Sequence, residues 1–289
     1  GRLNFDQVRI PRVNLLHKYG DVAPDGTYTS SIDSPGRRFF TMLGTLVQGR
    51  VSLDGAASAV SAMALAIAVT YGNQRRQFTA GSDTDEEVIL DYQRHQRRLI
   101  PRLATAYAMN FAHDEFLVKF DAVFSGKADT DDDRQDLETL AAALKPLSTW
   151  AALDILQEAR EACGGAGFMA SNRLVGLRAD LDVYVTFEGD NNVLLQLVAK
   201  RLLTDYSRRL AKPDAATLAA YAGQTAGDVV SRSGLRALGQ RIADFGSTAR
   251  SVGNVRGEAA QRQLLTDRVE TMVAAVAGRL KNAGSLPPA

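Results

Sequence analysis

Residues 45–78 read TLVQGRVSLDGAASAVSAMALAIAVTYGNQRRQF, and this stretch decides the fold. A helix of about 30 residues spans roughly 45 Å, and the many Ala, Ser and Gly residues here let neighbouring helices approach closely. The stretch therefore predicts the central helix of a bundle. Its apolar residues recur at steps of three and four, the spacing of one helix face: Leu46, Val47, Val51, Ala57, Val60, Ala64, Ile67, Ala68 and Tyr71.

Three further helices are expected after this one. They cover about 86–124, 134–163 and 190–210, and Pro101 should kink the first of them. Before the central helix, Ser34 and Pro35 suit the start of a short helix, which Gly44 and Gly49 separate from the long one. The fold class is therefore all-α, a four-helix bundle over residues 34–210. A second C-terminal helical domain is expected over 211–289, with helices at about 215–245 and 257–281.

The composition excludes several classes of protein. Hydrophobic residues make up 45% and charged residues 23% of the chain, which fits a folded domain, and a net charge of +1 gives no field that favours nucleic acid. Cys163 is the single cysteine, so no intrachain disulfide can form, and a cytoplasmic location is expected. No run of about 18 apolar residues was found, so no membrane span is predicted.

No metal site is expected either. The three histidines are scattered, without the spacing of metal ligands. Residues 126–136, GKADTDDDRQD, resemble the start of a calcium loop, but Arg134 stands where that loop needs glycine and Leu140 where it needs glutamate. A solvated helix N-terminus is the favoured interpretation of this acidic run.

Residues 1–33 are expected to be the end of a β-domain and a linker. The chain opens on a strand-like alternation of Leu3, Phe5, Val8 and Ile10, without an initiator Met. A chain that starts so abruptly is expected to be a piece of a longer protein.

Residues 182–192, DVYVTFEGDNN, contain the candidate catalytic residue. Glu188 ends a run of apolar residues and precedes Gly189, which permits close approach of another group. One interpretation is an exposed glutamate near a helix start. The other interpretation is a catalytic base surrounded by apolar groups, because the apolar run before Glu188 predicts a buried backbone. Burial favours the protonated carboxyl group and a helix N-terminus favours the ionised one, which suits abstraction of a proton alpha to a carbonyl.

Several segments together resemble the acyl-CoA dehydrogenase and acyl-CoA oxidase superfamily. The segment DVYVTFEGDNNVLLQLVAKRLL at 182–203 is similar to its catalytic segment, and EACGGAGF at 161–168 to its flavin turn. GR at 49–50 and YGNQRRQF at 71–78 match the two ends of its long helix, and FDQVRIPRVNLL at 5–16 the strand that leaves its β-domain. VILDYQRHQRRLIPRLATAYA at 88–108 is closer to the oxidase branch, although Ala166 and Phe168 depart from the oxidase pattern of His and Tyr.

The resemblance implies an FAD-dependent enzyme that converts a fatty acyl-CoA to a trans-2-enoyl-CoA. Glu188 would remove the alpha proton, its backbone N–H would polarise the thioester oxygen, and Arg50 and Gly189 would lie near the substrate. By the same matches, seven residues would contact FAD: Arg75, Gln77, Phe78, Gly164, Gly165, Asp190 and Asn192.

The resemblance also implies partners. The family commonly shares its FAD site between subunits, so a homo-oligomer is expected, and an N-terminal half would complete the acyl pocket. Oxygen is the expected electron acceptor. Two alternatives stay open at this point: a dehydrogenase that uses an electron-transfer flavoprotein, and a non-catalytic helical subunit that needs a partner carrying the missing half.

Overall fold

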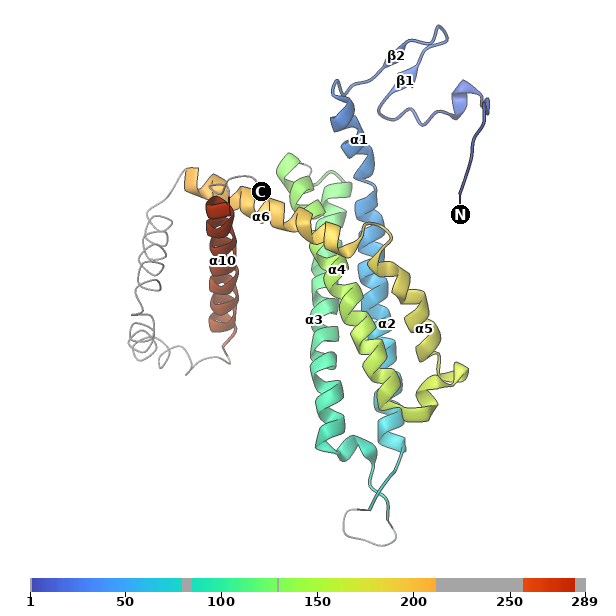
Figure 1. Ribbon diagram of the computed structural model, residues 1–289, viewed down its shortest axis with the longest axis vertical. Helices are drawn as coiled ribbons and strands as arrows, with labels where there is room; N and C mark the ends of the chain where they lie inside the picture. Colours follow the sequence, from blue (N-terminus) through green and yellow to red (C-terminus); the bar gives the residue numbers. More distant parts are fainter. Residues whose placement is uncertain (1, 80–84, 129, 212–256, 284–289) are drawn as a thin grey trace. The chain divides into compact units, whose positions relative to one another are not determined.

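The computed structural model of the chain describes residues 2–79, 85–128, 130–211 and 257–283 (Figure 1). The chain divides into two compact units, Gly1–Leu195 and Gln196–Ala289. The domain boundaries expected from the sequence stay a prediction. The first unit contains all the candidate site residues and is a helical bundle with almost no β-structure, as the sequence predicts.

Three long helices form the bundle and lie side by side (Figure 1): α2 (Leu46–Gln74), α3 (Gln93–Phe124) and α4 (Asp131–Ala162). At one end, Val47 and Val51 pack with residues late in α3 and early in α4. At the other end, Ala64 and Ala68 pack with residues early in α3 and late in α4. Helix α2 therefore runs parallel to α4 and antiparallel to α3.

Helix α2 is the core helix, and its small residues explain its position. Ala57, Ala64 and Ala68 are fully buried, so both neighbours approach closely. By length and composition α2 could cross a membrane, with a mean hydropathy of 1.6 over 18 residues, which corrects the expectation that no such run exists. However, α2 contains buried Arg50 and Asp54, and α3 and α4 pack along it. These features are typical of the core helix of a bundle.

Local sequence signals account for where the helices begin and end. Helix α1 (Pro35–Leu43) starts at Pro35 as expected, but Gly49 lies inside α2 instead of at a break. Thr130 and Asp133 form a capping box at the start of α4, so the acidic run is a helix N-terminus. Helix α3 begins at Gln93 instead of near residue 86, because residues 86–89 pair with residues 75–78 in a short antiparallel ladder.

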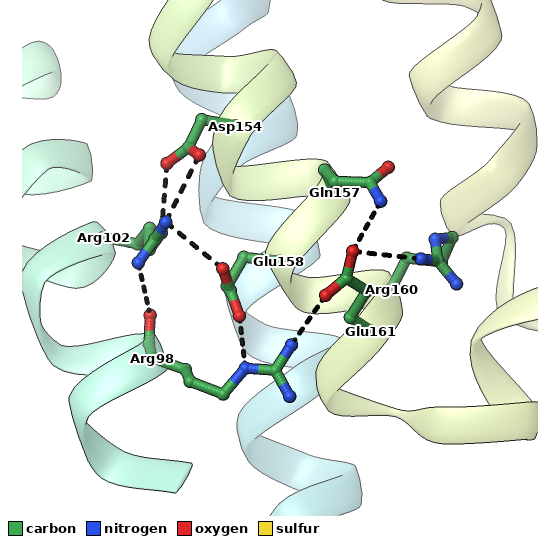
Figure 2. A network of polar contacts seen from close by, with 7 residues as sticks. All are labelled: Arg98, Arg102, Asp154, Gln157, Glu158, Arg160 and Glu161. Carbon is green, nitrogen blue, oxygen red and sulfur yellow. Dashed lines mark hydrogen bonds and ion pairs between the residues drawn. The ribbon is translucent and has the colours of Figure 1, made fainter. Parts of the chain in front are cut away.

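An ionic network joins α3 to α4 (Figure 2). Arg102 binds both carboxylate oxygens of Asp154, at 3.0 and 3.2 Å, and its bond to Asp154 is the main cause that raises its pKa. Arg98, one turn earlier, pairs with Glu158 and lies 3.0 Å from Glu161. These groups are partly exposed, so the network mainly fixes the register of the two helices.

The remaining elements include one that the sequence did not indicate. Helix α5 (Leu174–Asp182) packs against α4 and precedes the candidate base. Helix α6 (Asn191–Ala211) follows it, close to the expected 190–210. Helix α10 (Glu258–Ala283) matches the expected helix at 257–281, whereas the one at about 215–245 lies outside the described residues.

The N-terminal segment differs from the expected strand. Strands β1 (Asp21–Val22) and β2 (Tyr28–Thr29) form a small antiparallel hairpin, with Gly26 at φ 89° in its turn. Residues 3–10 form no strand, and their apolar side chains are exposed. A strand needs a neighbour for its backbone hydrogen bonds, and no described residues supply one here.

Candidate active site

Glu188 lies in a tight left-handed turn between α5 and α6. Val183–Val185 form a 3-10 turn, after which Glu188 adopts φ 56° and Gly189 φ 106°. The preceding apolar run is only partly buried: Val183 and Phe187 are 54% and 46% exposed, whereas Tyr184 packs against the core. A 3-10 turn points successive side chains in three directions, so one buried face cannot take them all.

The Glu188 side chain is nevertheless directed into the bundle. A Cβ atom placed on Gly49 of α2 would lie 2.7 Å from Glu188 Cδ and 2.7 Å from its Oε2, so only glycine leaves room for this carboxylate. Oε2 is buried and accepts no hydrogen bond from any described residue. A buried carboxylate oxygen without a partner is costly, and such atoms are typical of functional sites.

Arg50, one residue after Gly49, holds the backbone of the same turn. Its Nε donates to the backbone carbonyl oxygen of Glu188 at 3.0 Å. Arg50 is buried, and this burial is the main cause that lowers its pKa, with Glu138 and Glu188 acting in the opposite direction. The sequence predicted a substrate contact for Arg50, and the structure adds a direct contact with the base.

Lys145 of α4 is a site residue that sequence reasoning missed. Its side chain is 0% exposed, and Nζ donates to the Gly189 carbonyl at 2.7 Å and to Asn191 Oδ1 at 2.8 Å. The pKa of Lys145 is lowered to about 8, mainly by burial and next by the charge of Arg50. The carboxylates of Asp190 and Glu188 act in the opposite direction. A lysine inside the apolar run AAALKPLSTW was the available signal.

Asn191 connects this lysine to a second group on α4. Asn191 Nδ2 donates to Thr149 Oγ1 at 3.0 Å, and Thr149 Oγ1 donates to the Lys145 carbonyl at 2.7 Å. All three side chains are buried. The start of α6 is thus fixed to the middle of α4 by a closed set of hydrogen bonds.

Asp190 and Asn192, both predicted to contact the cofactor, lie at the start of α6. Asp190 Oδ1 accepts from the backbone N–H of Asn192 at 2.9 Å, which is the geometry of a helix N-cap. Asn192 is exposed in the first turn. One oxygen of Asp190 therefore already has a structural partner.

Arg75, Gln77 and Phe78 lie at the opposite end of α2 from Arg50. Their backbones belong to the ladder with residues 86–89: Ile89 N–H donates to the Arg75 carbonyl at 2.9 Å, and Gln77 N–H to the Glu87 carbonyl at 2.9 Å. All three side chains are exposed. Among the described residues, the Arg75 guanidinium makes no hydrogen bond or ion pair, so it can take an anionic partner.

Gly164 and Gly165 begin the turn Gly164–Phe168 that follows α4. Gly164 has φ 55°, and a Cβ atom on either glycine would meet open space. A Cβ atom on Gly167 would instead lie 2.0 Å from the Arg160 carbonyl oxygen. The first two glycines leave an open approach to the backbone, and Gly167 is the one that packing requires.

The structure therefore collects the predicted residues in two groups. Arg50, Glu188, Gly189, Asp190 and Asn192 form one group, and Arg75, Gln77, Phe78, Gly164 and Gly165 lie at the other end of α2 and α4. Arg75 follows Arg50 by 25 positions, which corresponds to about 38 Å of helix.

Comparisons with a family model and with individual relatives indicate the same protein family. The family model of the acyl-CoA oxidase C-alpha1 domain matches residues 43–203. An acyl-coenzyme A oxidase-like protein of Mus musculus is 44% identical over 72% of this chain and 33% of its own length. Acyl-coenzyme A oxidase 2, peroxisomal, of Arabidopsis thaliana is 45% identical over 72% of this chain and 30% of its own length.

A solved structure shares the fold. It is acyl-CoA oxidase-1 of Caenorhabditis elegans complexed with FAD and ATP, with a TM-score of 0.61 and 29% identity over 74% of this chain and 31% of that one. The chain spans about a third of the length of the curated relatives it matches, with shares of 33% and 30%. The family model, which covers more than half of the chain, shows that this protein belongs to the acyl-CoA oxidase family and contains its C-alpha1 domain.

Proposed function

We propose that this chain supplies the catalytic base and part of the FAD site of a fatty acyl-CoA oxidase. The observation that carries the proposal is the Glu188 carboxylate, which packs against Gly49 with one buried oxygen that lacks a partner. A base that abstracts a weakly acidic proton must be positioned at its substrate and shielded from bulk water. The bond from Arg50 to the Glu188 carbonyl and the burial of Oε2 support this role.

The turn also offers a donor for the developing charge. The backbone N–H of Glu188 donates no hydrogen bond within the described part of the chain, whereas its carbonyl oxygen is held by Arg50. In the proposed reaction Glu188 removes the alpha proton of the acyl-CoA thioester. Its own N–H then donates to the thioester oxygen as negative charge develops there, and the product is a trans-2-enoyl-CoA.

The residues present fit an FAD site. Within the described residues the Arg75 guanidinium has no partner, which suits a pyrophosphate, and Gln77 and Phe78 are exposed beside it. Gly164 and Gly165 leave the backbone accessible. FAD, when bound, supplies a two-electron acceptor for the beta hydrogen. One relative in the solved structures is complexed with FAD.

The separation of the two groups supports a shared site. Glu188 lies beside Arg50 at the start of α2 and Arg75 follows its end, so two copies would each contribute one of these groups to a site. A homo-oligomer is accordingly part of the proposal, as is an N-terminal part of the enzyme that completes the acyl pocket. Arg75→Ala should lower the FAD content of the purified oligomer, with Arg76→Ala as the neighbouring control.

Oxygen as the electron acceptor is the proposed variant, because the family model and the named relatives are those of oxidases. The alternatives are a dehydrogenase that reduces an electron-transfer flavoprotein and a non-catalytic helical subunit. Adding acyl-CoA to the full enzyme in air separates them: an oxidase releases hydrogen peroxide with each enoyl-CoA formed, a dehydrogenase reduces its flavin without sustained peroxide release, and a non-catalytic subunit does neither.

A cytoplasmic location stays a proposal. The Arabidopsis relative is named as peroxisomal, and neither compartment requires a disulfide, which agrees with the single buried Cys163. Fractionation of cells that express the full protein would decide between the cytoplasm and the peroxisome.

A further inference from the structure

Two buried cationic side chains, Arg50 and Lys145, bind the backbone carbonyl groups of Glu188 and Gly189, the turn that carries the candidate base. Arg50 Nε of α2 donates to the Glu188 carbonyl at 3.0 Å, and Lys145 Nζ of α4 donates to the Gly189 carbonyl at 2.7 Å. Glu188 has φ 56°, a conformation that costs roughly 1–2 kcal/mol for a residue with a Cβ atom. The turn keeps this conformation only where its surroundings fix it.

We infer that the Lys145 ammonium is a positioning residue for the proposed reaction, which holds the Glu188–Gly189 turn so that the base faces its substrate. The inference rests on the proposed function of Glu188. Lys145 itself contacts the carbonyl of Gly189 and the side chain of Asn191, and acts on the base through them.

Charge and burial explain why a lysine is needed at this position. A neutral apolar side chain would leave the Gly189 carbonyl and Asn191 Oδ1 without a donor in a dry interior, at about 1–3 kcal/mol for each. The groups whose charges act on the Lys145 ammonium are Arg50 from α2 and Glu188 and Asp190 from the turn before α6. Glu138 of α4 also acts on Arg50, so these charges comprise three carboxylates and two cations, and removing the lysine proton leaves Arg50 as the one cation among them.

The test uses the full-length enzyme with Lys145→Met, Lys145→Arg and Lys127→Met. Lys127 lies in an exposed loop and pairs with Asp121, so its variant is the matched control. For Lys145→Met we expect kcat to fall on the order of 10²-fold with little change in KM or FAD content, since misplacement of a reacting group by about 1 Å has such effects. Lys127→Met should match the wild type.

The pH profile separates positioning from simple support of the fold. The wild-type kcat should decline as pH rises through the pKa of Lys145, about 8. Lys145→Arg keeps the cation and should move this decline to higher pH, and Lys145→Met should lose it. An alkaline decline that is identical in all three proteins, or a wild-type kcat in Lys145→Met, would overturn the inference. If Lys145→Met does not fold, the profile of Lys145→Arg decides alone.

A second readout does not depend on turnover. Amide hydrogen exchange of the peptide covering residues 183–193 should be faster in Lys145→Met than in the wild type at pH 7, and unchanged in Lys127→Met. If the wild type shows no acyl-CoA turnover, the proposed function fails while the exchange result still stands. If turnover is present but exchange is equal in all proteins, Lys145 does not hold the turn.

Discussion

The Nε atom of Arg50 lies 3.0 Å from the backbone carbonyl oxygen of Glu188, although 138 positions separate the two residues in the chain. The bond joins the start of the core helix α2 to the turn that precedes α6. Gly49, the preceding residue of α2, makes room for the Glu188 carboxylate. One turn of one helix therefore holds the backbone of the candidate base and leaves room for its side chain.

Replacing Arg50 by methionine should weaken both activity and stability. The Glu188 carbonyl would lose its donor in a partly buried site, and we expect a loss of about 1–3 kcal/mol in unfolding free energy, together with reduced kcat. Urea unfolding and steady-state kinetics measure the two effects. Arg76→Met is the control, because Arg76 also donates to a backbone carbonyl, that of Glu86, but at an exposed site. Equal losses for both variants would refute the role given to Arg50.

Gly49→Ala should reduce turnover while leaving the fold intact. The added Cβ atom would meet the end of the Glu188 side chain, which can swing aside at little cost in stability but then no longer points at the substrate. Gly176→Ala in α5 is the matched control, because a Cβ atom there meets nothing within 4 Å. We expect Gly176→Ala to keep full activity and to gain about 0.5–1 kcal/mol in stability. Normal kcat in Gly49→Ala would argue against the observed carboxylate position.

Gly165 and Gly167, which follow α4, should differ in their tolerance to alanine. Gly167→Ala would force a Cβ atom against a backbone carbonyl and should destabilise the protein strongly, by more than about 2 kcal/mol. Gly165→Ala meets open space and should leave stability within about 0.5 kcal/mol of the wild type, while lowering FAD content if the flavin approaches here. Thermal unfolding and the flavin absorbance of the purified protein distinguish these outcomes.

Lys145 should make stability depend on pH in a defined direction. Its pKa in the folded protein is about 8, below the ordinary 10.5, so between these values the unfolded chain binds more protons and the unfolding free energy rises with pH. The interval corresponds to roughly 3 kcal/mol at most. The difference in unfolding free energy between the wild type and Lys145→Met should thus shift in favour of the wild type from pH 7 to pH 10. A constant difference would contradict the lowered pKa.

The sequence predicted the long helices well, because small and apolar residues at helical spacing identify them without tertiary information. It failed where tertiary contacts override local pattern. The apolar run 183–187 suggests a buried segment, but Val183 and Phe187 are exposed and residues 183–185 form a 3-10 turn. Helix α5 has no signal of this kind. Helix α3 begins later than the sequence pattern predicts, because the residues just before Gln93 include a segment that pairs with the chain after α2.

The candidate site was predictable only in part. The sequence identifies Glu188 as a carboxylate at the end of an apolar run. Gly49 and Arg50 are identified by their resemblance to the long helix of the acyl-CoA oxidase and dehydrogenase superfamily. The position of Lys145 against Gly189 arises from packing between α4 and a turn 44 residues away, which no local pattern encodes. Likewise, only the structure shows that the Arg75 group and the Glu188 group occupy opposite ends of the bundle.

The central claim, that Glu188 is the base, is tested most directly by anaerobic mixing of the full-length flavoenzyme with a saturated acyl-CoA, followed by flavin absorbance. We predict rapid bleaching in the wild type, and in Glu188→Gln an equal amount of bound FAD that stays oxidised. Bleaching of Glu188→Gln at the wild-type rate would contradict the account.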